Sequence, residues 1–195
     1  MRNKHRGFRF LVGKINRAHD AWDRNSTGLR GVVLYAVMGI AAALLINSVF
    51  GAILGTTFPV VTVSSTSMVP NLNVGDLVVV KGGASYELGD IIIFRGWEQK
   101  PIIHRVVAKY ENSAVTKREG WEELTTHDIE QKAAAIGASV AYITRGDANP
   151  SCDQCGGGRP AIRQEDVHGR ALLRVPYLGY VKLFAVRYVW NPLTG

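Results

Sequence analysis

A chain of 195 residues is long enough for one domain with a sizeable core and too short for two ordinary domains. Its net charge of +7 is concentrated in residues 1–30, where eight basic side chains accompany only two acidic ones. This distribution argues against a nucleic-acid-binding groove spread across the fold. It favours a basic segment that stays on the cytoplasmic side of a membrane.

Residues 31–54 are free of charged side chains and strongly apolar. As an α-helix they would span about 36 Å, enough to cross a hydrocarbon core of about 30 Å. The alternatives are a buried core helix and a cleaved export signal, but the apolar part of an export signal is only about 7–15 residues long. With the basic tail 1–30 in the cytoplasm, the positive-inside rule puts everything after the helix outside. The sequence therefore predicts a single-pass protein of the cell membrane, in contact with the lipid bilayer.

Residues 57–181 are predicted to form one mainly β domain outside the cytoplasm. Branched apolar runs alternate with turn residues such as Gly-Asp, which is typical of paired strands in a coiled sheet. The predicted strands cover residues 60–63, 77–81, 91–95, 102–107 and 171–175. Residues 120–135, rich in Glu, Gln, Lys and Ala, are the only soluble stretch predicted to be helical, as a small insertion on the sheet.

The last residues, 182–195, are too short and too charged to span a membrane. They are expected to lie at the membrane surface, with side chains that suit the interface acting as anchors. These anchors are Lys182, Arg187, Tyr188 and Trp190.

Cys152 and Cys155 are the only cysteines and stand three positions apart. Two cysteines are too few for a disulfide-built fold, and a zinc knuckle would need a second pair of ligands. The glycines at 156–158 do not provide the strand-to-helix context of a thioredoxin-like site. A local disulfide and two free thiols both remain open, with metal binding a third alternative.

The segment from Ser65 to Leu72 reads Ser-Thr-Ser-Met-Val-Pro-Asn-Leu and is followed by Gly75-Asp76. A Ser-rich loop alone indicates little, because a serine hydroxyl needs a base within reach to become a nucleophile. This spacing, directly after a membrane anchor, resembles the nucleophile box of type I signal peptidases, in the S26 serine protease family. The resemblance implies a signal-peptidase-like coiled β-sheet domain, no metal or organic cofactor, and Ser67 as the nucleophile.

His104 lies between apolar neighbours in the predicted strand 102–107 and is the candidate general base. A buried structural histidine is the alternative. In the bacterial branch of the family the equivalent strand carries a lysine, so a histidine is similar to the archaeal and endoplasmic-reticulum branch. The resemblance thus implies a Ser-His mechanism, which suits histidine because its unperturbed pKa is near 6.5.

The segment YITRGDANPSCD resembles the family box Thr-Lys-Gly-Asp-Asn-Asn-x-x-Asp-Asp, whose last aspartate orients the base. Alignment from Gly146 puts that aspartate at Asp153, with Cys152 at the preceding acidic position. Asp147 is the rival; the resemblance implies that it holds the loop or the histidine strand in place. If the two cysteines are bridged, the short ring would pin Asp153, and reductant would then lower activity.

The tetrahedral intermediate of acyl transfer needs hydrogen-bond donors for its oxyanion. The backbone N–H of Ser67 is one candidate, and the resemblance implies that the hydroxyl of Ser65 is another. The family's intervening glycine is Thr66 here, and a β-branched residue restricts that turn.

The resemblance covers residues 60–107 and 141–180. It implies a membrane-bound endopeptidase that removes signal peptides from secreted and membrane precursors, and it allows an association with the secretion translocon. One alternative is a dedicated processing protease for a few surface or pilin-like precursors. Another is a non-catalytic, membrane-tethered binding module, against which the presence of Ser67, His104 and Asp153 argues.

Overall fold

The computed structural model describes residues 28–156 and 158–185, and divides the chain into two compact units, Met1–Val49 and Phe50–Gly195. Nearly all of the predicted basic tail lies outside the described residues. The predicted anchors Arg187, Tyr188 and Trp190 also lie outside them.

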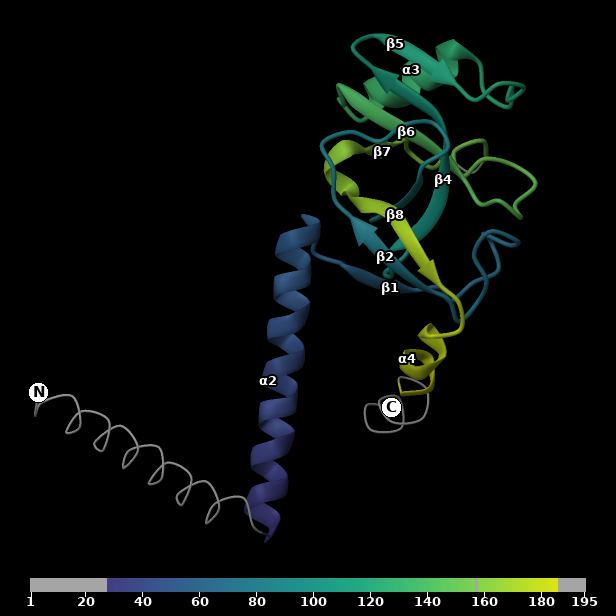
Figure 1. Cartoon of the computed structure of the whole chain (residues 1–195). Coiled ribbons are helices and arrows are strands. Elements are labelled where there is room, and N and C mark those ends of the chain that lie inside the picture. Colours follow the sequence, from purple (N-terminus) through teal and green to yellow (C-terminus); the bar gives the residue numbers. More distant parts are fainter. Residues whose placement is uncertain (1–27, 157, 186–195) are drawn as a thin grey trace, which may run out of the picture. The chain divides into compact units, whose positions relative to one another are not determined.

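The first described element is the apolar helix α2 (Gly28–Leu54), drawn in Figure 1. It begins three residues before the predicted span and ends at the predicted residue. Large apolar side chains are exposed along it, including Leu44, Leu45 and Ile46. A helix that is apolar all round suits a membrane span. Within the described residues, α2 is the one helix long and apolar enough to cross a membrane.

The second unit is built on one antiparallel sheet of eight strands. The order along the sheet is β1-β2-β8-β3-β4-β6-β7, with β5 paired to β4 as a hairpin (Figure 1). This curled sheet confirms the predicted mainly β, signal-peptidase-like architecture. The strands are β1 (Val60–Thr62), β2 (Leu77–Lys81), β3 (Ile91–Phe94), β4 (Ile102–Glu111), β5 (Ala114–Lys117), β6 (Val140–Arg145), β7 (Ile162–Arg163) and β8 (Val167–Val175).

The long strands β4 and β8 let the sheet curl. The register of β4 against β6 shifts between Val106 and Ala108, and β8 has register shifts against both β2 and β3. Such irregularities bend a strand and increase its twist. As a result β4 pairs with β3, β5 and β6 along its length, and it carries His104 near its beginning.

The core lies in three apolar clusters that follow the curl of the sheet. One packs Met68 and Leu72, from the loop that follows β1, onto β2 and β3. A second fills the middle of the sheet, and a third joins α3 (Thr126–Ala135) to β4 and β6. Burial of these side chains, at about 25 cal/mol per Å² of apolar surface, is the main force that holds the sheet in its curled form.

The helices differ from the sequence prediction in two places. Helix α3 begins at Thr126, later than the predicted start near 120, because Thr125 and Asp128 form a capping box that sets its first turn. A second short helix, α4 (Gly179–Ala185), occupies residues that the sequence did not predict to be helical and crosses the predicted boundary at 181/182. The backbone N–H of Gly179 donates to the carbonyl of Gly75, 2.9 Å away, which fixes its start.

Candidate active site

Ser67 lies in the loop between β1 and β2, in a tight turn that is held by buried neighbours and by backbone hydrogen bonds. The side chains of Met68 and Leu72 are buried in the core, at 1% and 4% exposure. Val69 donates its N–H to the carbonyl of Thr66 at 3.1 Å, and Leu72 donates to Met68 at 2.9 Å. These contacts turn the Met68 side chain inward and leave Ser67 facing a cleft.

His104 projects from β4 toward this loop. It pairs with Ile92 of β3 in the sheet, and its side chain is 9% exposed. Its Nε2 lies 3.0 Å from the Oγ of Ser67, which is hydrogen-bond distance. The strand thus brings together two predicted residues that stand 37 positions apart.

Asp153 lies on the other side of the His104 ring, with Oδ2 2.6 Å from Nδ1. Its side chain is only 3% exposed. The hydroxyl of Thr144 donates to the same oxygen at 2.7 Å, and the backbone N–H of Asp153 donates to the Thr144 carbonyl at 2.8 Å. Gln154 adds a further hydrogen bond between these two segments, because its Oε1 accepts the Thr144 N–H at 2.9 Å.

Asp147, the other candidate for orienting His104, forms its hydrogen bonds with Arg105 and Asn71. It accepts two hydrogen bonds from Arg105, at 2.7 and 2.6 Å, and one from Asn71 at 2.8 Å. Burial raises the pKa of Asp147, but the hydrogen bonds from Arg105 and Asn71 outweigh it, so the pKa lies below its ordinary value. Asp147 thus joins Arg105, the residue after His104, to the loop that contains Ser67 and Asn71.

Candidate oxyanion donors lie beside Ser67. The Oγ atoms of Ser65 and Ser67 are 3.2 Å apart. Across residues 28–156 and 158–185 the backbone N–H of Ser67 has no hydrogen-bond acceptor, so it is free to donate to a bound group. The carbonyl of Ser67 accepts the N–H of Ala148 at 2.8 Å, which links Ser67 to the loop that follows β6.

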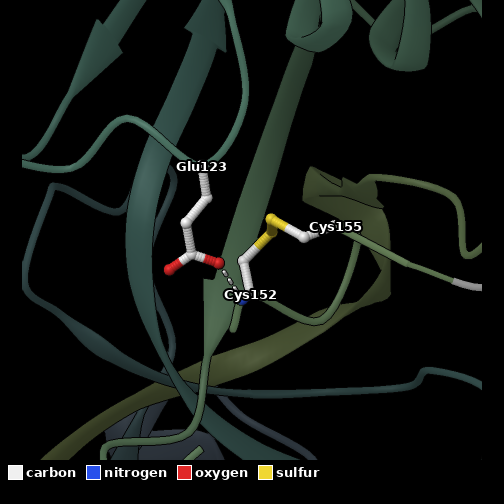
Figure 2. A group of neighbouring side chains, drawn as sticks. All are labelled: Glu123, Cys152 and Cys155. Carbon is white, nitrogen blue, oxygen red and sulfur yellow. Dashed lines mark hydrogen bonds between the residues drawn. A yellow bond between two sulfur atoms is a disulfide. The ribbon is translucent and has the colours of Figure 1, made fainter. Parts of the chain in front are cut away.

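Cys152 and Cys155 form a disulfide, the first of the alternatives left open by the sequence. Figure 2 shows Glu123 beside it, accepting the backbone N–H of Cys152 at 2.6 Å. Potential ligand atoms of Glu123 and the two cysteines lie within 4.8 Å of one another. A cysteine binds metal as its thiolate, so the bridged sulfurs do not suit a metal site.

Ser67 and His104 line a cleft of about 280 Å³. The wall beyond His104 contains residues that the sequence analysis did not single out. The guanidinium of Arg159 stacks over the ring of Trp97 at 4.2 Å from its centroid, and Lys100 lies in the same wall. Motifs could not indicate this pair, because the two residues are far apart in the chain and meet only through the fold.

Sequence analysis also missed three residues near Asp153. Thr144 donates to Asp153, Gln154 accepts from the backbone of Thr144, and Glu123 accepts from the backbone of Cys152. The signal for Thr144 was a polar residue at the end of the apolar run Ala141–Ile143, in a box already singled out for its aspartates. Thr144 is fully buried, and a buried hydroxyl needs a partner. No comparable signal marked Glu123, which lies in the unmatched region between β4 and β6.

Comparison with known proteins agrees with the geometry. The family described as "Signal peptidase, peptidase S26" matches residues 33–110, which include Ser67 and His104. Signal peptidase complex catalytic subunits named SEC11 are similar over most of the chain. The protein from Verticillium alfalfae is 26% identical over 170 residues, 77% of this chain and 84% of the relative. The one from Aspergillus terreus is 28% identical over 164 residues, 81% of each. The chain is therefore similar to signal peptidases of the peptidase S26 family, which are hydrolases, and the likeness to the family is strongest over residues 33–110.

Proposed function

We propose that this protein is a membrane-bound serine endopeptidase that removes N-terminal signal peptides from secreted and membrane precursors. Ser67 is the nucleophile, His104 the general base and Asp153 the acid that orients the base. The observation that carries this proposal is the pair of contacts of the His104 ring, 3.0 Å to Ser67 Oγ and 2.6 Å to Asp153 Oδ2.

The proposed chemistry follows from these contacts. With Nδ1–H donated to Asp153, the Nε2 lone pair of His104 faces Ser67 and takes the hydroxyl proton as Oγ attacks the scissile carbonyl. The Asp153 carboxylate stabilises the imidazolium that forms. His104 then returns the proton to the leaving amine, and water releases the acyl group from Ser67 in a second round of the same steps.

The negative charge of the tetrahedral intermediate needs donors beside Ser67. We assign this role to the backbone N–H of Ser67 and the hydroxyl of Ser65. The free N–H and the 3.2 Å separation of the two Oγ atoms support this assignment. One such donor typically contributes about 2.7–4 kcal/mol to lowering the barrier.

Asp147 has a positioning role in this proposal and does not transfer the proton. Its contacts to Arg105 and Asn71 hold the residue next to His104 and the loop of Ser67 at a fixed separation. A bidentate pair of Arg and carboxylate suits this role, because its geometry is fixed in both distance and direction.

The substrate segment is proposed to enter the cleft in an extended form. Strand β1 is at the edge of the sheet and leads directly into the loop of Ser67. An exposed edge can pair with an extended peptide through its backbone groups, while small side chains at the cleavage site fit shallow pockets.

The membrane topology belongs to the same proposal. The basic tail is in the cytoplasm, α2 spans the bilayer, and the catalytic domain is outside. The disulfide between Cys152 and Cys155 supports this topology, since such bonds persist in oxidising compartments. The membrane anchor holds the site near substrates whose own apolar segment is in the bilayer. It thereby raises the effective concentration of substrate at the site. Because the SEC11 relatives are named as subunits of a complex, partner subunits are expected too.

The test is cleavage of a precursor with alanine at the two usual specificity positions, by the full chain in detergent micelles. Ser67→Ala should abolish cleavage, because residual catalysis without the nucleophile is lower by about six orders of magnitude. Ser139→Ala is the matched control and should retain full activity, because Ser139 is exposed and does not line the cleft. Equal rates for wild type and Ser67→Ala would exclude the proposed mechanism.

A further inference from the structure

Glu123 lies just before α3, in the segment 112–139 that joins β4 to β6. Its carboxylate accepts three hydrogen bonds: from the backbone N–H of Cys152 at 2.6 Å (Figure 2), from Nη1 of Arg145 at 2.9 Å, and from the indole N–H of Trp121 at 3.1 Å. No motif and no part of the family match covers this segment, since the match ends at residue 110.

Two of these partners, Cys152 and Arg145, are chain neighbours of residues at the proposed acid, Asp153. Cys152 directly precedes Asp153 in the chain. Arg145 directly follows Thr144, whose hydroxyl donates to Oδ2 of Asp153 at 2.7 Å. One carboxylate therefore ties together the two backbone segments from which Asp153 is oriented toward His104.

The position of Glu123 is itself fixed by the core. Trp121, two residues earlier, is 7% exposed and packs in one cluster with Ile129 and Ala133 of α3. Two residues later, Thr125 caps the same helix. The chain is thus fixed on both sides of Glu123. The Glu123 carboxylate is therefore a hydrogen-bond acceptor in a fixed position.

The disulfide alone does not supply this restraint. The ring closed by Cys152 and Cys155 sets the local turn that contains Asp153 and Gln154. The ring must also be oriented relative to β4, which carries His104. The hydrogen bond from Cys152 N–H to Glu123 is charge-assisted and short, and such bonds are strong and directional.

We propose that Glu123 is a positioning residue, which holds Asp153 at its hydrogen-bonding distance from His104 through the backbone of Cys152 and the side chain of Arg145. This role rests on the proposed function. It gives the segment between β4 and β6 a part in catalysis, although none of its residues touches the reacting atoms.

Activity and stability should respond differently to the loss of this carboxylate. The side chains of Glu123 and Arg145 are 25% and 34% exposed, and ion pairs with this much solvent contact contribute little to stability. A small displacement of a catalytic group, in contrast, can lower the rate by up to about 100-fold. The melting temperature should therefore change little while kcat falls.

The experiment is a double-mutant cycle between Glu123→Ala and Asp153→Ala in the full chain, with kcat and KM measured on the precursor substrate. Glu123→Ala should lower kcat about tenfold, with KM unchanged. In the Asp153→Ala background it should cause no further loss, because the group that it positions is gone. Glu123→Gln keeps an acceptor oxygen and should recover part of the activity; it carries the same test if Glu123→Ala fails to fold. Glu122→Ala is the matched control, since Glu122 forms no hydrogen bond in the part of the chain that the structure describes.

Two results would overturn the role of Glu123. One is wild-type kcat in Glu123→Ala. The other is the same fold loss in both backgrounds, which would show that Glu123 acts on the fold in general. Both are distinguishable from a failure of the proposed function, in which Ser67→Ala would still cleave or the wild type would not.

Discussion

A β-carbon built on Gly146 would lie 2.7 Å from the carbonyl oxygen of Ser67. The N–H of Ala148 donates to the same oxygen at 2.8 Å. The loop after β6 and the loop that contains Ser67 therefore meet backbone to backbone. A shift of either loop at this point would disturb the carbonyl of Ser67 or its hydrogen bond to Ala148.

Gly146→Ala should therefore lower kcat strongly. The added methyl group must displace the Ser67 carbonyl, and a shift of about 1 Å in a catalytic group can lower the rate about 100-fold. Steady-state kinetics with the precursor substrate would measure this decrease in kcat. Gly83→Ala is the control, because its β-carbon would meet its nearest neighbour at an ordinary 3.5 Å. Unchanged kcat in Gly146→Ala would mean that this contact does not set the position of Ser67.

Thr144→Val should lower kcat about tenfold. The valine keeps the shape of the buried side chain but removes the donor to Oδ2 of Asp153. A hydrogen bond to a charged group contributes about 1.5–3 kcal/mol, and 1.4 kcal/mol corresponds to a factor of ten in rate. Thr116→Val, an exposed threonine of β5, should leave kcat at the wild-type value. A Thr144→Val enzyme as fast as wild type would contradict a contribution of this donor.

Asp147→Asn should destabilise the protein by about 2 kcal/mol at neutral pH, because the hydrogen bonds from Arg105 lose their charged acceptor. The pKa of Asp147 is lowered in the folded state, so its stabilising contribution is fully present above the unfolded-state pKa, about 3.9. It is lost as the pH falls through the lower folded-state pKa.

Denaturant unfolding of wild type and Asp147→Asn between pH 3 and 7 would measure this dependence. The difference in free energy of unfolding should be constant at neutral pH and shrink below about pH 4. A difference that grows toward acid pH would show that Asp147 is protonated in the folded protein.

Reductant should lower the activity of the wild type. Opening the ring between Cys152 and Cys155 frees the turn that holds Asp153. The loss of stability should be modest, about 2 kcal/mol, because the closed loop is very short. The double variant Cys152→Ser, Cys155→Ser should have the lower activity from the start and should not respond to reductant. Full wild-type activity after verified reduction would contradict the prediction.

Much of the fold was predictable because its strands are local apolar runs bounded by turns. The runs at 77–81, 91–95 and 102–107 coincide with the starts of β2, β3 and β4. Strands β5 and β7 have only four and two residues, and they form because β4 and β6 offer them an edge. Nothing in such short segments marks them as strands before the rest of the sheet exists.

The candidate site, too, could be predicted from the sequence only in part. Motif spacing singled out Ser67 and His104, but it left Asp147 and Asp153 as rivals, because spacing does not show which carboxylate turns toward the ring. That choice depends on the contacts of Thr144 and Arg105 across the sheet. Glu123 was beyond prediction for a related reason: its bond to Cys152 spans 29 residues and a helix.

Strand β8 lies between β2 and β3 in the described sheet, so it is the strand that joins the part bearing Ser67 to the part bearing His104. Residues 167–175 are also the last strand, in chain order, of the part of the chain that the structure describes. Without β8, the described sheet would be two half-sheets with no strand pairing between them. Assembly of the proposed site therefore requires a strand that contributes neither Ser67 nor His104.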